Sequence, residues 1–544
     1  MTAKIPQKIN RMVGRQLHLN TTRSLCALIS GALITLSLAP FSFWPLAIIA
    51  CGILFVVLQQ QSIKQSFWLG WCFGLGLFGT GASWVYVSIH DFGYTSIYFA
   101  ALLTFLFCGG LAFCCAITWA LYAWLLKKHN VIVSNSHSMR FAMQTVSTQH
   151  LILFASVWVC GEWLRSWLLT GFPWLFIGYS QTESLLAGWA PIVGVYGISF
   201  IICLSGATLS YLLLSRKNYY GSRSLLTAVA LCWFIAIPLK HVPWTVPAED
   251  NDENKKPRQV SMVQANISQH DKWRREFRQP TLALYKNLSE SHWQTSELVI
   301  WPEAAISMYY QYASNFLDQM AAQATKHQSA LVTGIPSRDT DSDLDNRSDS
   351  NNRYNSIITI GNASGIYHKQ NLVPFGEYIP FANLLGNVLA FFELPASTMH
   401  AGNADQTPLT IQQWQSKPLI CYEIVYPGLA AKAAAVSDVL ITVSNDSWFG
   451  GSIGPLQHLQ MAQMRALENG RYVLRSTGSG VSAIINPAGK IVARSAQFEQ
   501  TVLTGEFKLM QQKTPWTAFG YWLTPFLCCA PLIFQIYSKF NKLR

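Results

Sequence analysis

Residues 24–239 are almost entirely apolar, and this run limits the fold more than any other feature of the sequence. A helix needs about 20 mostly apolar residues to cross the hydrocarbon core of a bilayer, and the run is long enough for several such helices. Residues 251–512, by contrast, have the mixed composition of a globular protein. Only 12% of the whole chain is charged, whereas soluble domains carry about 25%. The sequence therefore predicts a membrane half followed by a soluble half.

Eight apolar segments are candidates for membrane-spanning helices: 24–40, 43–59, 67–89, 95–126, 150–170, 192–215, 226–239 and 516–538. The first seven make up a predicted membrane domain of residues 24–240, and the eighth follows the soluble half. The basic N-terminus and the first apolar run together also resemble a cleavable signal peptide. We interpret this run as an uncleaved first span, because further spans follow at once. The expected fold is a helical membrane bundle of about eight spans.

The positions of Lys and Arg predict the orientation of this bundle, because short cytoplasmic loops are enriched in positive residues. Fifteen Lys and Arg residues lie on one side, in the tails 1–23 and 539–544 and in alternate connections. The opposite short connections, near 40–43, 90–94 and 171–191, contain none. The split predicts that both termini are cytoplasmic basic tails. After seven crossings, the soluble half then lies outside the cytoplasm.

A net charge of +12 is also compatible with nucleic-acid binding, but the distribution of charge argues against it. Between Lys255 and Lys513 there are 22 Lys and Arg residues against 20 Asp and Glu residues. No basic stripe interleaved with aromatic residues is present in the sequence. We therefore expect a membrane partner and no nucleic-acid partner.

The soluble half contains short β-rich runs that alternate with helical stretches. The runs are 259–264, 298–301, 330–334, 356–361, 418–421, 439–444 and 481–486, and the helical stretches are near 276–291, 313–326 and 455–470. Strands that alternate with helices predict an α/β domain, here a layered αββα sandwich over residues 255–512.

Eleven of the twelve cysteines lie in or near the apolar segments, and Cys421 is the only one in the soluble half. A disulfide-stabilised domain outside the cytoplasm shows cysteines in pairs. A single thiol is either buried as a structural residue or used in chemistry. The sequence has no HExxH, paired CxxC or phosphate-binding loop, so we expect neither a metal nor an organic cofactor.

Three segments of the soluble half carry residues suited to acyl transfer: Trp301-Pro302-Glu303, the stretch from His368-Lys369 to Gly376-Glu377, and Cys421-Tyr422-Glu423. A cysteine is mostly protonated at neutral pH, so it needs a base such as a carboxylate within reach. A lysine ammonium stabilises the oxyanion of a tetrahedral intermediate. A thioester on the cysteine then divides one difficult transfer into two easier steps.

These motifs resemble the nitrilase superfamily over about 255–512, and the arrangement of spans around the domain resembles apolipoprotein N-acyltransferases of bacterial envelopes over nearly the whole chain. The resemblance implies that Cys421 is the nucleophile, Glu303 the general base and Lys369 the oxyanion stabiliser. It implies supporting roles for Glu377, Tyr422, Glu423, Trp273 and Asn445. The family usually has Gly-Asn where this chain has Ala265-Asn266.

The resemblance also implies the reaction and its place. A fatty acyl chain passes from a membrane phospholipid, through a Cys421 thioester, to the amine of the S-diacylglyceryl cysteine of an apolipoprotein. The reaction is of the ping-pong type, and it completes lipoprotein maturation. The implied location is the bacterial inner membrane, with the catalytic domain on the periplasmic side and both termini in the cytoplasm.

Three further features are candidates for lipid contact, each with a structural alternative. The apolar stretch 381–395, which includes Phe391 and Phe392, is either a lipid-facing arm or an ordinary core helix. Trp448 and Phe449 are either a lid or ordinary packing. Glu162 and Arg165 lie one helical turn apart near the end of the fifth span, where they either pair with each other or contact a phospholipid headgroup.

Two other functions remain open at this stage. A membrane-anchored amidase of the nitrilase type, with water as acceptor, has identical motifs, although seven spans are many for an anchor. A transporter or channel with an external binding domain predicts internal repeats and several ionisable residues within spans. The sequence shows chiefly Glu162 and Arg165.

Overall fold

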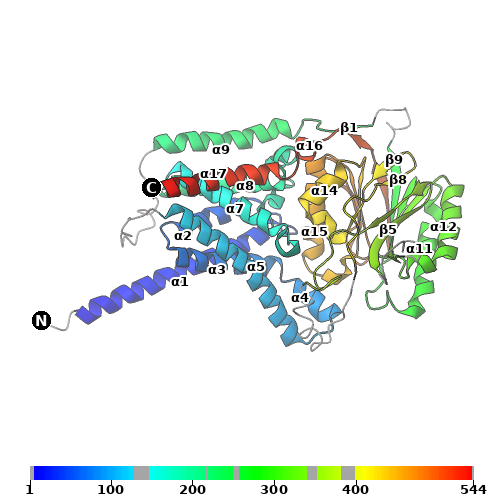
Figure 1. Ribbon diagram of the computed structural model, residues 1–544, viewed down its shortest axis with the longest axis horizontal. Coiled ribbons are helices and arrows are strands. Elements are labelled where there is room, and N and C mark those ends of the chain that lie inside the picture. The colour runs from blue at the N-terminus through cyan, green and yellow to red at the C-terminus, as the bar shows by residue number, and fades with distance from the viewer. Residues whose placement is uncertain are drawn as a thin grey trace.

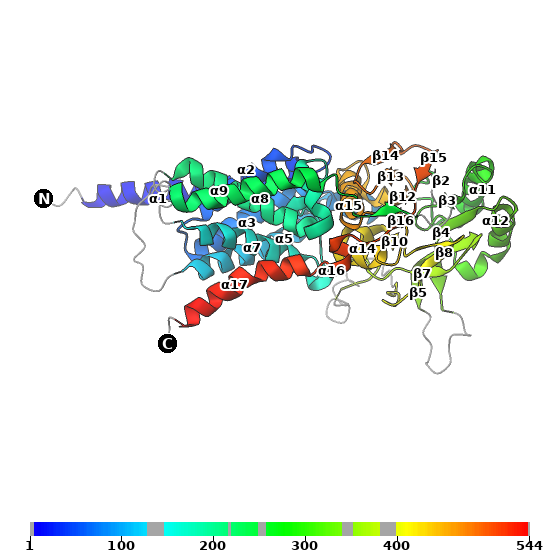
Figure 2. The same ribbon diagram turned by 90° about the horizontal axis from the view of Figure 1, so that it is seen from above.

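The computed structural model describes residues 5–127, 146–215, 219–248, 257–339, 352–380 and 399–541. A bundle of long helices forms one end of the molecule, and a domain of two β-sheets and covering helices forms the other (Figure 1). The N-terminal helix extends beyond the bundle, away from the sheets (Figure 2). The two halves that the composition predicts are therefore distinct in space.

The helical half contains α1 (Ile5–Ser37), α2 (Pro45–Leu58), α3 (Ile63–Gly81), α4 (Val85–Val87), η1 (Ser88–Phe92), α5 (Ile97–Leu126), α7 (Thr148–Arg165), α8 (Ala190–Leu214), α9 (Tyr219–Leu239) and α17 (Leu523–Asn541). Close approaches at glycine hold the bundle together. A Cβ atom on Gly76 of α3 would lie 2.0 Å from the carbonyl oxygen of Leu28 in α1. Only glycine permits these two helices to pack so closely, as small residues do between membrane helices.

Three of these helices are long and apolar enough to cross a membrane: Ile97–Leu126, Leu185–Leu214 and Leu523–Asn541. A fourth is added if α3 and the segment Val85–Phe92, which meet at a bend of 61°, count as one span. Among the described residues this is fewer than the eight predicted spans. The predicted span 67–89 is bent, and 516–538 is divided at Gly520 into α16 (Pro515–Phe519) and α17.

The connection between α7 and α8 is a folded wedge, mostly buried from Gly171 onward, rather than a simple loop. It contains η2 (Leu168–Thr170), η3 (Ile177–Gln181) and η4 (Leu185–Trp189). Trp174 and Phe176 are fully buried, and Gly171 has a φ of 85°, a conformation that favours glycine. The wedge lies between the helical bundle and the sheet domain, where it contacts the segment that carries Cys421.

The sheet domain contains two principal sheets. The six-stranded sheet has the order β15 (Thr501–Phe507), β2 (Arg258–Gln264), β3 (Leu298–Ile300), β4 (Ala330–Arg338), β5 (Arg353–Gly361) and β7 (Ile366–His368). The five-stranded sheet has the order β10 (Leu419–Ile420), β11 (Leu440–Ser444), β12 (Val473–Thr477), β13 (Ala483–Ile485) and β14 (Ile491–Arg494). Strands β2, β3 and β4 pair in parallel, and so do β10, β11 and β12, as alternation of strands with helices predicts.

Five shorter strands complete the domain. A three-stranded sheet has the order β6 (Ala363–Ser364), β8 (Leu409–Ile411) and β9 (Trp414–Ser416). Strands β1 (Val246–Pro247) and β16 (Met510–Gln511) pair near the junction with the helical half. They bring the chain into and out of the domain side by side.

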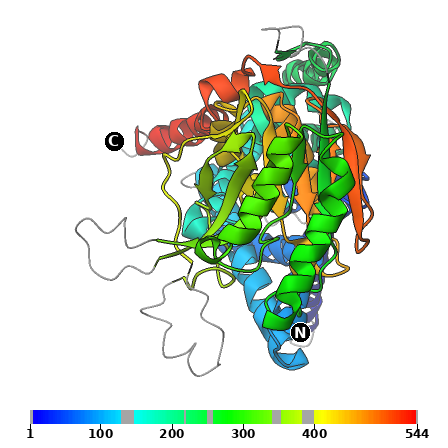
Figure 3. The same ribbon diagram turned by 90° about the vertical axis from the view of Figure 1, so that its right-hand side faces the viewer.

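The side chains of the strands alternate between two cores, as the two-residue period of a strand requires. In β3, Leu298 and Ile300 pack between the two sheets, whereas Val299 faces the helices. Helices α11 (Arg278–Ser289) and α12 (Ser314–Lys326) cover the six-stranded sheet on its outer face (Figure 3). The layers are therefore helix, sheet, sheet, helix.

The fourth layer consists of α14 (Pro427–Ala434) and α15 (Gly454–Asn469), which pack between the five-stranded sheet and the helical bundle. Every residue of α15 except the half-buried Leu456 is buried. Its Gln457 Oε1 accepts hydrogen bonds from the indoles of Trp84 and Trp174. Its Glu468 Oε1 accepts from the backbone N–H of Val195, next to the kink of α8 at Gly194. Polar contacts thus fix the orientation of the domain on the bundle.

Candidate active site

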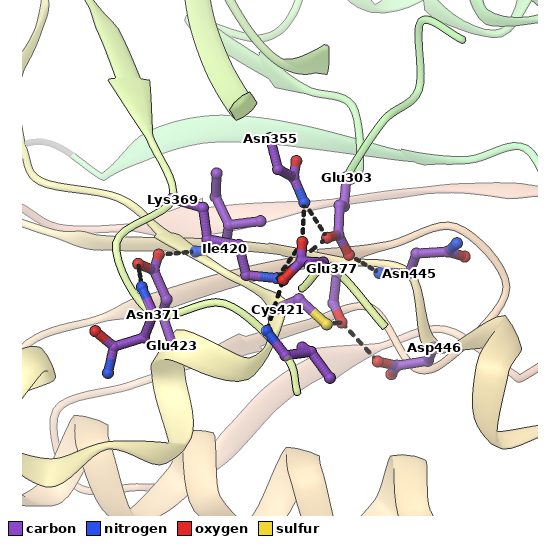
Figure 4. Close-up of polar contacts among 12 residues, drawn as sticks. Glu303, Asn355, Lys369, Asn371, Glu377, Ile420, Cys421, Glu423, Asn445 and Asp446 are labelled. Atoms are coloured by element: carbon purple, nitrogen blue, oxygen red, sulfur yellow. Dashed lines mark hydrogen bonds and ion pairs between the residues drawn. The ribbon is translucent and has the colours of Figure 1, made fainter. Parts of the chain in front are cut away.

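The three predicted catalytic residues each follow a strand. Glu303 comes three residues after β3, Lys369 directly after β7, and Cys421 directly after β10. The first two strands belong to the six-stranded sheet and the third to the five-stranded sheet. The layering therefore brings three residues that are each more than 50 positions apart in the sequence to one place between the sheets (Figure 4).

Lys369 is 1% exposed and is held by two carboxylates. Its Nζ lies 2.9 Å from Glu377 Oε1 and 2.8 Å from Glu377 Oε2, but 3.7 Å from Glu303 Oε1. Burial opposes the ammonium charge, yet the adjacent Glu377 and Glu303 outweigh it, so the pKa of Lys369 is raised. Lys369 is therefore a fixed cation, suited to stabilise negative charge on a substrate oxygen.

Glu303 is oriented by hydrogen bonds to both of its oxygens. Asn355 Nδ2 donates to Oε1 at 2.8 Å, and the backbone N–H of Asn445 donates to Oε2 at 2.7 Å. The same Asn355 amide donates to Glu377 Oε1 at 2.8 Å, which keeps the two carboxylates side by side. Glu377 neutralises most of the charge of Lys369, and this leaves the carboxylate of Glu303 available to accept a proton.

Cys421 has a φ of 52°, in the left-handed region that residues other than glycine rarely occupy. Such a conformation costs about 1–3 kcal/mol and is typical of functional sites. Burial and the charge of Glu303 raise the pKa of the Cys421 thiol to about 12, although Lys369 opposes this shift. The resting sulfur is a thiol, so the reaction needs a base to remove its proton.

Glu423, two residues after Cys421, is a buried structural clamp. Its Oε1 accepts hydrogen bonds from the Tyr367 hydroxyl and from the backbone N–H groups of Gln370 and Asn371. Its Oε2 accepts from the backbone N–H of Ile420 at 2.7 Å. The carboxylate thus joins the segment that follows Lys369 to the segment that carries Cys421, and it fixes the distance between these two residues.

Tyr422 points toward the helical half rather than toward the carboxylates. Its hydroxyl donates to the carbonyl oxygen of Gly171 at 3.2 Å, and its ring is stacked on Trp174. The hydroxyl of Tyr426 donates to the carbonyl of Thr170 at 2.9 Å. The segment that carries Cys421 therefore packs against the wedge of the helical half.

The predicted lid residues differ in their surroundings. Phe449 is half-buried and packs edge-on against Trp84, with ring centroids 4.7 Å apart, which favours ordinary packing. Trp448 is 43% exposed, and its carbonyl accepts a hydrogen bond from Ser88 in η1. Trp273 is 49% exposed, on the turn that follows β2. The stretch 381–395, with Phe391 and Phe392, lies outside the described residues, between the described ranges 352–380 and 399–541.

Glu162 and Arg165 are both buried, and each makes contacts other than a direct ion pair. Glu162 Oε1 accepts hydrogen bonds from Trp158 Nε1 and from the backbone N–H of Ile177. The Arg165 guanidinium lies over the rings of Phe78 and Phe176, 5.0 and 5.1 Å from their centroids. A cavity of about 40 Å³ beside both residues is much smaller than a phospholipid headgroup. One water needs about 10–15 Å³ of such volume, so the cavity has room for about three water molecules.

The structure adds residues that sequence reasoning missed, and these are Asn355, Lys272, Ser444, Asp446, His458 and Arg475. Asn355 bridges the two carboxylates from β5, and no local signal in the sequence points to it. Lys272 lies beside Trp273 but is 6% exposed, and its Nζ donates to the carbonyl of Glu303 at 2.9 Å. Burial lowers the pKa of Lys272 to about 8. Its signal in the sequence was proximity to the tryptophan that the resemblance singled out.

Among the described residues, no three His, Cys, Asp or Glu side chains are grouped so as to hold a metal ion. The chemistry of the site is that of a carboxylate, an ammonium and a thiol. Carbon–nitrogen hydrolases are the class to which this arrangement and the layered sheets correspond, and the family model "Carbon-nitrogen hydrolase" matches residues 259–513.

A second family model, "Apolipoprotein N-acyltransferase N-terminal domain", matches residues 30–208. The chain is 43% identical to an apolipoprotein N-acyltransferase of Pseudomonas aeruginosa over 500 residues, which are 92% of each protein. It is 42% identical to that of Azotobacter vinelandii, again over 92% of each. A solved carbon–nitrogen hydrolase superfamily protein from Xanthomonas campestris matches 46% of this chain and 91% of its own, at 19% identity and a TM-score of 0.35. The chain belongs to the apolipoprotein N-acyltransferase family.

Proposed function

We propose that the protein transfers a fatty acyl chain from a membrane phospholipid to the α-amino group of the S-diacylglyceryl cysteine of an apolipoprotein. The observation that carries this proposal is the arrangement of Glu303, Lys369 and Cys421 in a chain of this family. The nucleophile segment also contacts the buried wedge of the helical half through Tyr422. Substrates held in a bilayer around that half therefore lie close to the thiol, which supplies proximity.

The first half of the reaction forms a thioester. Glu303 takes the proton of the Cys421 thiol, and the sulfur attacks the ester carbonyl carbon of the phospholipid. Lys369 donates to the oxyanion of the tetrahedral intermediate, where an ammonium is worth more than in water because the site is buried. The ester C–O bond breaks, Glu303 returns the proton to the leaving oxygen, and a lysophospholipid departs.

The second half transfers the acyl chain to nitrogen. The α-amine of the acceptor attacks the thioester carbonyl, Glu303 takes a proton from that amine, and Lys369 again stabilises the oxyanion. The C–S bond breaks, and the proton returns to the sulfur as an amide forms. One base, Glu303, thus serves both halves of this ping-pong route.

The first test is intact-mass analysis of the purified protein after incubation with phospholipid in the absence of acceptor. We expect the wild type to gain the mass of one fatty acyl chain, in a bond that hydroxylamine cleaves. The Cys421→Ala variant should gain none. Addition of a diacylglyceryl peptide should discharge the adduct onto the peptide. Absence of an adduct, with a reactive Cys421, would instead indicate an amidase that uses water as acceptor.

The membrane topology is part of the proposal. We propose eight crossings, with residues 24–240 and 516–538 in the membrane, a catalytic domain of 255–512 on the periplasmic side of the inner membrane, and tails 1–23 and 539–544 in the cytoplasm. The asymmetry of Lys and Arg supports this orientation. Labelling of single cysteines introduced at Asp405 and at Lys542 with a membrane-impermeant reagent tests it: only the first should react in intact spheroplasts.

A further inference from the structure

Behind the sulfur of Cys421 lies a set of polar groups from two strands of the five-stranded sheet, one turn and the covering helix. Ser444 is the last residue of β11, Asp446 begins the turn η10 (Asp446–Phe449), Arg475 lies in β12 and His458 in α15. Each of the four side chains is at most 1% exposed. The proposed triad uses none of them, although burial of four polar side chains is costly unless they are fully paired.

Ser444 lies between the nucleophile and this set. Its Oγ is 2.6 Å from Asp446 Oδ1 and 3.3 Å from Cys421 Sγ. A hydroxyl has a single hydrogen, so it donates to one of the two neighbours and accepts from the other. A separation of 2.6 Å is typical of a hydroxyl that donates to a carboxylate. In the resting site Ser444 therefore donates to Asp446, and Cys421 Sγ, 3.3 Å away, is the alternative acceptor of the same hydrogen.

Asp446 is a fixed acceptor. Burial disfavours its charge, but Arg475 Nη2 at 2.6 Å outweighs this, so the pKa of Asp446 is lowered. His458 Nδ1 lies 3.1 Å from Arg475 Nη2 and 3.3 Å from Asp446 Oδ1. His458 Nε2 lies 3.2 Å from the carbonyl oxygen of Cys421. The imidazole therefore joins this set to the backbone of Cys421, and burial and the charge of Arg475 lower the pKa of His458.

Loss of the thiol proton changes which hydrogen bond of Ser444 is favourable. A thiolate only accepts hydrogen bonds, so the lone pairs of Ser444 Oγ would face its negative charge unless the hydroxyl rotates. Rotation of this one bond directs the hydrogen at the sulfur, which lies within reach at 3.3 Å. Asp446 then loses the hydrogen bond from Ser444 but keeps its ion pair with Arg475, so its charge stays paired.

We propose that Ser444 is a positioning residue that switches its hydroxyl from Asp446 to the sulfur when Cys421 loses its proton, and so stabilises the thiolate. The thiol proton goes to Glu303, Ser444 keeps its own hydrogen, and no bond of Ser444 forms or breaks. The same hydrogen bond stabilises the sulfur again when it leaves the thioester. This inference rests on the proposed function only in taking Cys421 as the nucleophile.

Several elements packed against Cys421 carry charged or titratable groups. These groups act on the sulfur together with Ser444. They are Glu303 after β3, Lys369 after β7, Lys272 in the turn after β2, Asp446 in η10 and His458 in α15. All of them stay unchanged in a substitution of Ser444. A shift in the reactivity of the sulfur is then attributable to the hydroxyl.

The test compares Ser444→Thr with Ser444→Val in the full-length protein. The two replacements have nearly the same shape, so any disturbance of packing is shared, and only Thr keeps a hydroxyl. The readout is the rate at which iodoacetamide alkylates Cys421 between pH 7 and 9, followed by mass spectrometry of the peptide that carries it. A hydrogen bond to a charged group is worth enough for at least a tenfold effect. We therefore expect alkylation about tenfold slower in the Val variant than in the Thr variant at each pH.

Ser416→Ala is the matched control, because Ser416 is fully buried and its Oγ donates to a backbone carbonyl far from the sulfur. It should alkylate at the wild-type rate. Equal rates for the Thr and Val variants would overturn the role of Ser444. Alkylation does not need an acyl donor, so this outcome is separable from failure of the proposed function, in which the Ser444 effect persists but no acyl adduct forms on the wild type.

Discussion

Replacement of Glu377 by Gln tests whether Glu377 is the carboxylate that pairs with Lys369 and so leaves Glu303 available as the base. Glu377 accepts from Lys369 through both oxygens, at 2.9 and 2.8 Å, from Asn355 Nδ2 at 2.8 Å and from the backbone N–H of Val373 at 2.8 Å. An amide has one accepting oxygen and no charge, so at least one of these donors loses its partner. Lys369 is then left with Glu303 as its only carboxylate, 3.7 Å away in the present arrangement.

The size of the effect follows from burial. Removal of one partner from a buried ion pair costs about 3–5 kcal/mol. Movement of Lys369 onto Glu303 recovers part of this, and we expect a remaining cost of about 2–3 kcal/mol. If this cost appears in the transition state, thioester formation slows about 30- to 150-fold. The loss arises because Glu303, once paired with Lys369, is a weaker base for the thiol.

The assay is single-turnover formation of the acyl-enzyme with excess phospholipid, followed by intact mass. Thermal unfolding of the same samples separates a catalytic effect from loss of the fold. Glu276→Gln is the matched control, because Glu276 is exposed and pairs with Arg274 on the surface, where such pairs are worth little. A Glu377→Gln protein that acylates at the wild-type rate would refute the division of roles between Glu377 and Glu303.

Three further predictions concern Cys421, its neighbour Tyr422 and Glu468 of α15. Because the thiol pKa is raised to about 12, alkylation of Cys421 should rise about tenfold per pH unit from pH 7 to 10; a plateau near pH 8 would contradict this. Tyr422→Phe removes the bond to Gly171 but keeps the stacked ring, so unfolding should become easier by about 1 kcal/mol, measured by thermal unfolding in detergent. Burial raises the pKa of Glu468 to about 7, so its contribution to stability should be present below about pH 4.5 and lost as pH rises through 7. Glu468→Gln should flatten the change in melting temperature between pH 5 and 8, and an unchanged slope would count against this.

The sequence predicted the local elements of the soluble half well. The run 259–264 lies within β2, the helical stretch near 313–326 coincides with α12, and that near 455–470 coincides with α15. Apolar periodicity and turn residues are local signals, and strands and helices form on a local scale. The motifs around Glu303, Lys369 and Cys421 were equally visible, because each follows a short apolar strand.

The number and shape of the apolar helices were less predictable. Hydropathy marks segments such as 67–89 as continuous, yet the chain bends by 61° between Gly81 and Val85 and packs its second part, through Ser88, against Trp448. Nothing in the local composition separates a straight span from a bent one. Packing against the sheet domain, which is distant in the sequence, decides it.

Sequence alone thus predicted which residues carry the chemistry, since each residue type in a recognisable motif has a characteristic reference pKa, charge and nucleophilicity. Only the tertiary structure decided how those residues share protons and charge. Glu377 rather than Glu303 is the closer partner of Lys369, Asn355 joins the two carboxylates, and Ser444 faces the sulfur. These relations depend on distances between strands of different sheets. Such distances are set by how the layers pack, which no single segment of the chain encodes.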